Sequence, residues 1–156
     1  MMRALIRDLW RDRRGASLVE LALIAPVLIT VFAGILDCGR MFAAKLNLQQ
    51  IAERSVEMAT SAGVSNQTYQ AIQTNMQSDA TSAAPSTATV TATLWLECNG
   101  TKQSDFNSAC NTGEQIARYA SLTINGSYTP TFPLLFGTLV SNGKIALRGA
   151  ASVRLQ

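Results

Sequence analysis

The longest apolar stretch of the chain covers residues 16–36, where Ser17, Glu20 and Thr30 are the only polar side chains. Its twenty-one residues would extend about 31 Å as a helix, which matches the hydrocarbon core of a bilayer. A buried core helix of a soluble protein is the alternative interpretation. The length of the run and the arginines before it favour a single membrane-spanning helix.

The next segment, residues 37–62, has the period of an amphipathic helix that continues from the apolar run. Glu53, Arg54 and Glu57 lie away from the apolar face. Gly63 is expected to weaken the helix. The apolar face is predicted to consist of Leu48, Ile51, Ala52, Ser55, Val56 and Ala59.

A second amphipathic piece follows, with Tyr69, Ile72 and Met76 on one stripe. The residues after it, 77–87, are small and polar and include a proline. That composition is typical of a loop.

Three later stretches alternate between apolar and polar positions, as half-buried strands do: 87–98, 116–128 and 143–155. Within the second stretch, Asn125-Gly126 is either a hairpin turn or a bulge in one strand. Between the last two stretches, the proline-containing segment 129–143 is expected to form an irregular apolar loop or a short helix. The fold class is therefore predicted to be α+β, with a long helix followed by a small antiparallel sheet.

Charge is concentrated at the start of the chain. Residues 1–15 contain five arginines and two aspartates, which accounts for the net charge of +3, so the rest of the chain is neutral. A nucleic-acid-binding domain needs a basic face, and the sequence predicts none. The basic tip instead indicates topology: by the positive-inside rule the N-terminus is cytoplasmic, because only Arg40 and Lys45 closely follow the apolar run.

The sequence contains no histidine, which removes the commonest general base and a common metal ligand. The three cysteines, Cys38, Cys98 and Cys110, have no zinc-site spacing. With no G-x-S-x-G motif and no plausibly spaced carboxylate pair, a secreted enzyme is disfavoured. Neither a metal nor a cofactor is expected.

An ordinary secretory signal peptide is an alternative for the N-terminal segment, but its apolar region should be shorter. A lipoprotein signal would use Cys38, and Asp37 stands where a small residue is needed. Cleavage at the far end of the run is therefore disfavoured.

The near end of the run has a more specific pattern. A basic leader with Arg11, Arg13 and Arg14 ends at Gly15, and Glu20 is the fifth residue after that glycine. This pattern resembles the class III signal of type IV pilins and pseudopilins. The longer stretch RRGASLVELALIAPVLITVFAGILDCGRMF, residues 13–42, is similar to the TadE-like minor pilins of the tight-adherence (Flp) pilus system.

The resemblance implies that a prepilin peptidase cuts between Gly15 and Ala16. It also implies that Glu20 pairs with the new Ala16 amine of a neighbouring subunit, since both charges are costly at membrane depth. A Glu20 that snorkels or is protonated without a partner is the alternative. Pro26 removes one backbone hydrogen bond and permits a helix kink, although a tolerated membrane proline is an equal interpretation.

The end of the chain also resembles TadE-like proteins, which finish with a Y-x-P-x-F-P-type turn and a last strand with an arginine near its end. Tyr128, Pro130, Phe132, Pro133 and Arg154 fit that order. The middle of the chain, residues 63–115, matches no motif. The hydrophobic patterns and the resemblance together predict a leader (1–15), a transmembrane helix (16–36), stem helices (37–82) and an antiparallel β head (83–156) that contains the Cys98–Cys110 loop.

Two cysteines, Cys98 and Cys110, enclose a short loop in the segment that the topology places outside the cytoplasm. A disulfide is allowed there, and two free thiols are the alternative. A bridge across so short a loop would contribute about 3 kcal/mol. Cys38 has no nearby partner and is expected to be a small buried residue.

The function that the resemblance implies is structural: a minor pilin or pseudopilin of a Tad/Flp type IVb pilus, used in surface adhesion. Its partners would be the membrane, the major pilin, other minor pilin-like proteins, the prepilin peptidase and the assembly platform. The head would face the periplasm from the bacterial inner membrane, or the exterior in a pilus. Alternatives are an uncleaved single-pass anchored binding module and a type II secretion pseudopilin.

Overall fold

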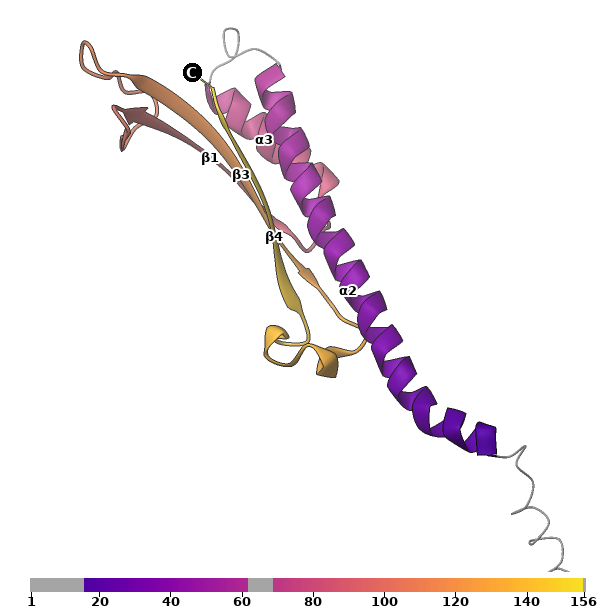
Figure 1. Ribbon diagram of the computed structural model, residues 1–156. Helices are drawn as coiled ribbons and strands as arrows, with labels where there is room; N and C mark the ends of the chain where they lie inside the picture. Colours follow the sequence, from indigo (N-terminus) through magenta and orange to yellow (C-terminus); the bar gives the residue numbers. More distant parts are fainter. Residues whose placement is uncertain (1–15, 62–68, 156) are drawn as a thin grey trace, which may run out of the picture. The chain divides into compact units, whose positions relative to one another are not determined.

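A computed structural model describes residues 16–61 and 69–155 of the chain. The leader at 1–15 and Gly63 therefore lie outside the described residues. The chain divides into two compact units, Met1–Gly39 and Arg40–Gln156. We call the second the folded unit, because it contains the sheet and both helical segments that cover it (Figure 1).

Two helices precede the strands. Helix α2 covers Ala16–Ser61, and α3 covers Tyr69–Ala83. The predicted face of α2 is confirmed at Leu48, Ile51, Ala52, Ser55 and Val56, which are all buried. Ile72, Met76 and Ala80 form the buried stripe of α3.

The sheet has four antiparallel strands in the order β2-β1-β3-β4. Their bounds are Thr89–Cys98 for β1, Thr101–Lys102 for β2, Ile116–Tyr128 for β3 and Ile145–Arg154 for β4. All three alternating stretches are thus strands, and the α+β class is confirmed, with a pilin-like order of a long apolar helix, a second helix and a sheet. The two-residue strand β2 was not predicted, because it is too short to show a period.

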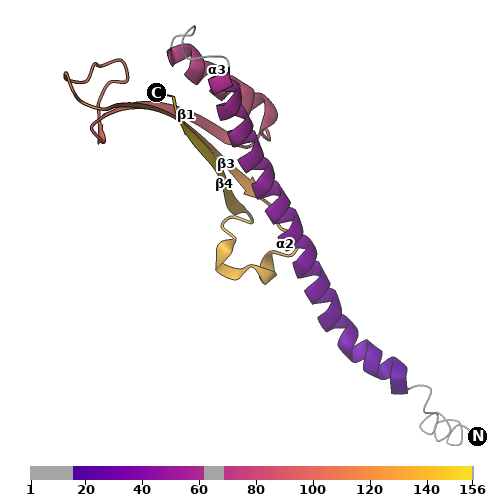
Figure 2. The ribbon, with the colours of Figure 1, turned by 45° about the horizontal axis from the view of Figure 1, so that its top comes forward.

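Both helices of the folded unit lie on one face of the sheet (Figures 1 and 2). The core between the layers is aliphatic. Ala120, Leu122 and Ile124 of β3 are fully buried at its centre, where α2 contributes Leu48 and α3 contributes Ile72. The polar members of each alternating strand occupy the other face of the sheet.

Polar side chains connect the two helices at one point and connect the helices to the sheet at two. Ser55 on α2 donates to the Asp79 carboxylate on α3 over 2.7 Å. Gln73 on α3 donates to the carbonyl of Ala92 in β1 over 2.8 Å. Gln49 on α2 donates to the carbonyl of Ala150 over 2.9 Å and accepts from its N–H over 3.1 Å.

The helices and the sheet approach most closely at two glycines. A Cβ atom on Gly149 would lie 2.5 Å from the backbone carbonyl of Leu48, and one on Gly126 would lie 3.0 Å from the side chain of Leu48. Glycine at these positions lets α2 lie directly on β3 and β4.

Both predictions for Asn125-Gly126 are wrong. The register of β3 with β4 runs through this dipeptide without interruption, and the register with β1 extends to Asn125, so the dipeptide forms neither a turn nor a bulge. The glycine is needed for the approach of Leu48 rather than for its backbone freedom. The hairpin turn lies instead at Asn99-Gly100, where both residues have positive φ, 51° and 78°, as a type I′ turn requires.

The predicted loop at 77–87 is also wrong in its first part, because α3 continues to Ala83. Ala80 is fully buried against the sheet, and the hydroxyl of Thr81 donates to the carbonyl of Gln77, one turn earlier. Small residues that resemble a loop in isolation thus allow close packing of a helix. The segment at 129–143 contains two short 3₁₀ helices, Pro133–Leu135 and Gly137–Leu139.

Candidate functional site: the exposed apolar helix and the disulfide-bounded end of the sheet

The N-terminal part of α2 exposes its apolar side chains on every side. Leu23 is 74% exposed, and three consecutive residues, Val27, Leu28 and Ile29, are each about half exposed or more. Successive residues of a helix point about 100° apart, so no polar face remains that could be turned to water. Such a surface needs an apolar medium or apolar partner helices.

Among the described residues, one helix is long and apolar enough to cross a membrane. It covers Ser17–Met58, and none of its most apolar window is buried within the molecule. The predicted span at 16–36 lies almost entirely within it.

Glu20 is exposed on this apolar surface. It lies one helical turn from Ala16, the first residue of α2, and residues four apart share one face of a helix. Gly15, Arg11, Arg13 and Arg14, the other predicted processing residues, lie outside the described residues. Cleavage and charge pairing therefore stay predictions.

Pro26 lies inside α2, which continues through it. Its missing N–H leaves the carbonyl of Ala22 without its usual helical donor. One turn later, the Thr30 hydroxyl donates to the carbonyl of Val27 over 2.8 Å, so this polar side chain is satisfied within its own helix, as a membrane requires. A kink at Pro26 stays a prediction.

Cys38 is a free, exposed cysteine. The prediction of a small buried residue is therefore wrong. The reason is its position on α2, where it follows an apolar run that is itself exposed rather than packed. Burial inferred from residue type assumes a surrounding core, and this part of the helix has none of its own.

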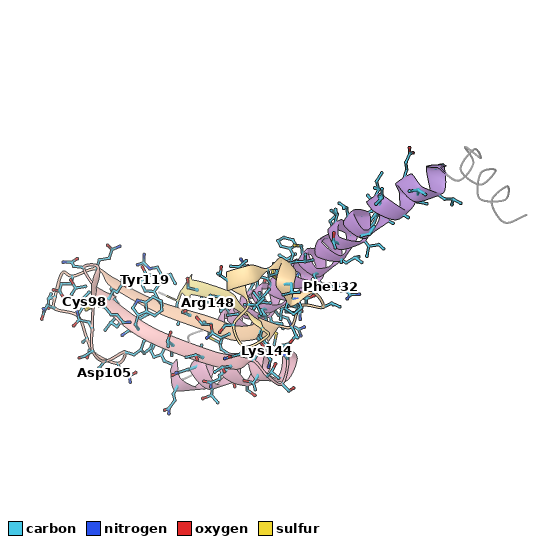
Figure 3. The ribbon with its side chains drawn as sticks, turned by 90° about the horizontal axis from the view of Figure 1, so that it is seen from below. Cys98, Asp105, Tyr119, Phe132, Lys144 and Arg148 are labelled. Atoms are coloured by element: carbon cyan, nitrogen blue, oxygen red, sulfur yellow. A yellow bond between two sulfur atoms is a disulfide. The ribbon has the colours of Figure 1, made fainter. Side chains whose placement is uncertain are left out.

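The other two cysteines, Cys98 and Cys110, form a disulfide with a Cα–Cα distance of 5.6 Å. Of the two alternatives left open by the sequence, the bridge is confirmed. Cys98 ends β1, so the bridge closes the β1–β2 hairpin and the loop after it. This loop lies at one end of the sheet (Figure 3).

An aromatic contact holds the same loop against the rest of the sheet. Phe106 within the loop meets the ring of Tyr69, at the start of α3, edge to face with centroids 4.5 Å apart. The guanidinium of Arg118 on β3 lies over both rings, 5.3 Å and 5.8 Å from their centroids. The disulfide and this cluster therefore fix the loop at two separate points.

The carboxylate of Glu114 lies close to the sulfurs of Cys98 and Cys110. Sulfurs joined to each other are not thiolates, and the thiolate is the metal-binding form. Glu114 instead accepts from the backbone N–H of Asn111 over 2.9 Å, closing a tight turn. This cluster is structural.

The solvent-facing side of the sheet carries an aromatic pair that sequence reasoning missed. Trp95 of β1 and Tyr119 of β3 are cross-strand partners, and their rings stack with centroids 5.1 Å apart. The ammonium of Lys102 lies over the ring of Trp95, 5.3 Å from its centroid, and the indole N–H donates to Glu97 over 2.8 Å. Both aromatic residues stand at positions where the alternation of their strands predicts polar side chains. That departure from the pattern was the sequence signal for an exposed aromatic pair.

Comparison with known families gives one relationship. Residues 15–59 match the family described as TadE-like protein. No curated protein and no solved structure gave a significant match. The matched segment contains Glu20, the exposed apolar part of α2 and the buried face from Leu48 to Val56, which are the features described above. The segment that contains the candidate membrane span, residues 15–59, is therefore the part of the chain that matches the TadE-like family.

Proposed function

We propose that this protein is a minor pilin or pseudopilin of a tight-adherence (Flp) type IVb pilus. It is inserted in the bacterial inner membrane with its N-terminus in the cytoplasm and its head in the periplasm. A prepilin peptidase removes the leader, residues 1–15, after Gly15. The mature subunit then takes part in pilus assembly, and the pilus serves surface adhesion.

One observation supports this proposal above the others: the match to the TadE-like family coincides with a helix whose large apolar side chains are exposed on all sides from Leu18 to Phe32. A helix of this kind can dissolve in lipid and can pack against similar helices in a filament. The partners that follow are the major pilin, other minor pilin-like proteins, the peptidase and the membrane platform. The same domain favours a tight-adherence role over that of a type II secretion pseudopilin.

Glu20 has a specific role in this proposal. Cleavage after Gly15 creates an α-amine on Ala16, and Glu20 of a neighbouring subunit pairs with it inside the packed helices. Removing one partner of a desolvated pair is costly, so the pair fixes the axial position of each subunit.

The Glu20→Gln variant tests this role. It should insert normally but give roughly tenfold less assembled pilus, which corresponds to the loss of more than 1 kcal/mol per contact. Glu57→Gln, at an exposed position in the folded unit, is the matched control and should assemble normally. Equal pilus yields from the two variants would remove the pairing role.

The first experiment measures the intact mass and N-terminal sequence of the membrane-extracted protein, from cells with and without their prepilin peptidase. A peptidase-dependent start at Ala16 is expected. A start at Met1 or Met2 in both strains would contradict processing and favour an uncleaved, anchored binding module. A start beyond residue 33 would indicate an ordinary signal peptide and would contradict the filament role.

A further inference from the structure

The loop between β3 and β4 presents apolar side chains to its surroundings, although the strands on either side bury theirs. Leu134 is 96% exposed and Leu139 is 66% exposed, and Phe132 and Leu135 are each about half exposed. Residues 129–143 contain no charged residue. A contiguous exposed apolar group of this kind marks an interaction surface.

The base of this loop is fixed. Pro130 is buried, and Phe136 and Val140 pack against the aliphatic core. Consecutive 3₁₀ turns satisfy the backbone: the N–H of Phe136 donates to the carbonyl of Pro133, and the N–H of Leu139 to that of Phe136. The exposed leucines thus lie on a short segment that is held by its own turn hydrogen bonds and by two core side chains.

The position of the loop follows from the register of α2 on the sheet. Gln49 bonds Ala150, and Leu48 meets Gly149. Further toward the N-terminus of α2, Ala44 lines a small cavity together with Ser127 and Leu147. Residues of α2 nearer its N-terminus therefore contact the sheet nearer the end where β3 stops and β4 starts. The loop between β3 and β4 lies at that end.

Only a few residues of chain separate the apolar run from the folded unit. Arg40, where the folded unit starts, comes four residues after Leu36, a distance of about 6 Å along a helix and at most about 14 Å in an extended chain. Two further apolar side chains near this junction, Phe42 and Leu46, are exposed. Exposed apolar side chains of α2 thus also occur within the folded unit, on the same part of the helix as Ala44.

Charge is also unevenly distributed over the folded unit. The end that carries the loop is formed by segments 40–47 and 129–148. These segments contain no acidic residue and four basic residues, Arg40, Lys45, Lys144 and Arg148. All six acidic residues of the folded unit lie elsewhere in its sequence. Figure 3 shows Phe132 and Lys144 at one end of the sheet and Cys98 and Asp105 at the other. Exposed apolar side chains next to cations fit a bilayer surface with anionic phosphates.

We propose that the loop from Phe132 to Leu139 inserts into the headgroup–acyl boundary of the bilayer that α2 crosses, with nearby lysine and arginine side chains on lipid phosphates. The head is then held against the membrane by a second contact besides its helix. The loop has to leave the lipid when the subunit enters a filament. This inference rests on the membrane-spanning part of the proposed function.

The test uses the full chain with Cys38→Ser, reconstituted at high lipid excess in vesicles of phosphatidylethanolamine and phosphatidylglycerol. A single cysteine is introduced by Leu134→Cys or, as the control, by Thr74→Cys on the exposed side of α3, and each is labelled with an environment-sensitive fluorophore. Both positions are exposed, so neither change removes a core contact. An intact Cys98–Cys110 bridge, measured by mass, shows that each variant is folded.

A spin label carried at shallow depth on the lipid should quench the probe at residue 134 about threefold more strongly than the probe at residue 74. Aqueous iodide should show the reverse order. Because both probes are on the same chain type, mixed orientation of the protein in the vesicles affects them equally.

Each other outcome overturns the inference in a distinguishable way. Equal quenching at the two positions, with the chain resistant to alkaline extraction, removes the lipid contact and leaves the membrane span intact. If neither quencher reaches the probe at residue 134, then protein, such as a second copy of the chain, covers the loop in place of lipid. Release of the chain by alkali removes both the span and the lipid contact.

Discussion

Leucine residues in the two parts of α2 have very different surroundings. Leu23 is 74% exposed, whereas Leu48 is 3% exposed and lies against Gly126 and Gly149 of the sheet. The earlier part is apolar on all sides, so no core of its own sequence can bury it. The later part is apolar on one side only, and the sheet covers that side. The comparison shows that apolar content alone does not predict what a helix contacts. A helix that is apolar on all sides needs lipid or partner helices, whereas a helix that is apolar on one face can pack on the core of its own chain.

The largest expected effect comes from truncating the leucine of the packed part. Leu48→Ala should lower the free energy of unfolding by about 3 kcal/mol, because it leaves a cavity between α2 and the two glycines. Leu23→Ala should change it by less than about 0.5 kcal/mol, because that side chain has no core contacts to lose. Urea titration of the full chain in detergent, followed by tryptophan fluorescence, measures both. Equal losses would mean that the early part of α2 belongs to the folded core.

Removal of the disulfide should have a similar but differently located effect. The double change Cys98→Ser and Cys110→Ser should lower the unfolding free energy by about 3 kcal/mol, since the unfolded chain regains the freedom of a closed loop. Cys38→Ser, at an exposed free cysteine of α2, is the control and should leave stability unchanged. The same titration checks both variants. A destabilised Cys38→Ser protein would show that this thiol has a structural contact.

A smaller effect is expected from adding one methyl group where helix and sheet meet. Gly149→Ala places a Cβ atom 2.5 Å from the backbone of Leu48, so α2 must move, at a cost of about 2 kcal/mol. Gly39→Ala is the matched change outside the folded unit, where a Cβ atom meets nothing within 4 Å. It should be neutral or stabilise the helix by up to about 1 kcal/mol. Thermal unfolding of the two variants side by side measures the difference, and equal shifts would contradict the close approach.

The Asn-Gly dipeptides show what the sequence can and cannot predict. Asn99-Gly100 and Asn142-Gly143 both have two positive φ angles and form tight two-residue turns. Asn125-Gly126 has the same local preference but is extended in β3, because its glycine faces Leu48 from a helix almost eighty residues earlier. The sequence predicts which dipeptides favour a turn. It does not predict a contact between distant elements, such as that of Gly126 with Leu48, that overrides this local preference.

The same distinction explains the other outcomes. Periodicity over many residues predicted α2, α3 and the three long strands, together with the buried faces that they share. Length and composition predicted that residues 16–36 form an apolar helix long enough to cross a membrane, and the roles of Gly15 and Glu20 stay predictions. The stacking of Trp95 on Tyr119 depends on strand register, and the helical state of residues 77–83 depends on the sheet that covers Ala80. Both need the tertiary structure.

The smallest expected effect concerns the edge of the sheet. β4 is an edge strand, and the amide side chain of Gln49 occupies both backbone groups of Ala150. Gln49→Ala should lower the unfolding free energy by about 1 kcal/mol, because edge groups that lose a partner can still reach water. The neighbouring Gln50 is exposed, and Gln50→Ala should have no effect. Hydrogen exchange at the Ala150 amide should become faster only in Gln49→Ala, and unchanged exchange there would show that the packed part of α2 holds the edge strand by its apolar contacts alone.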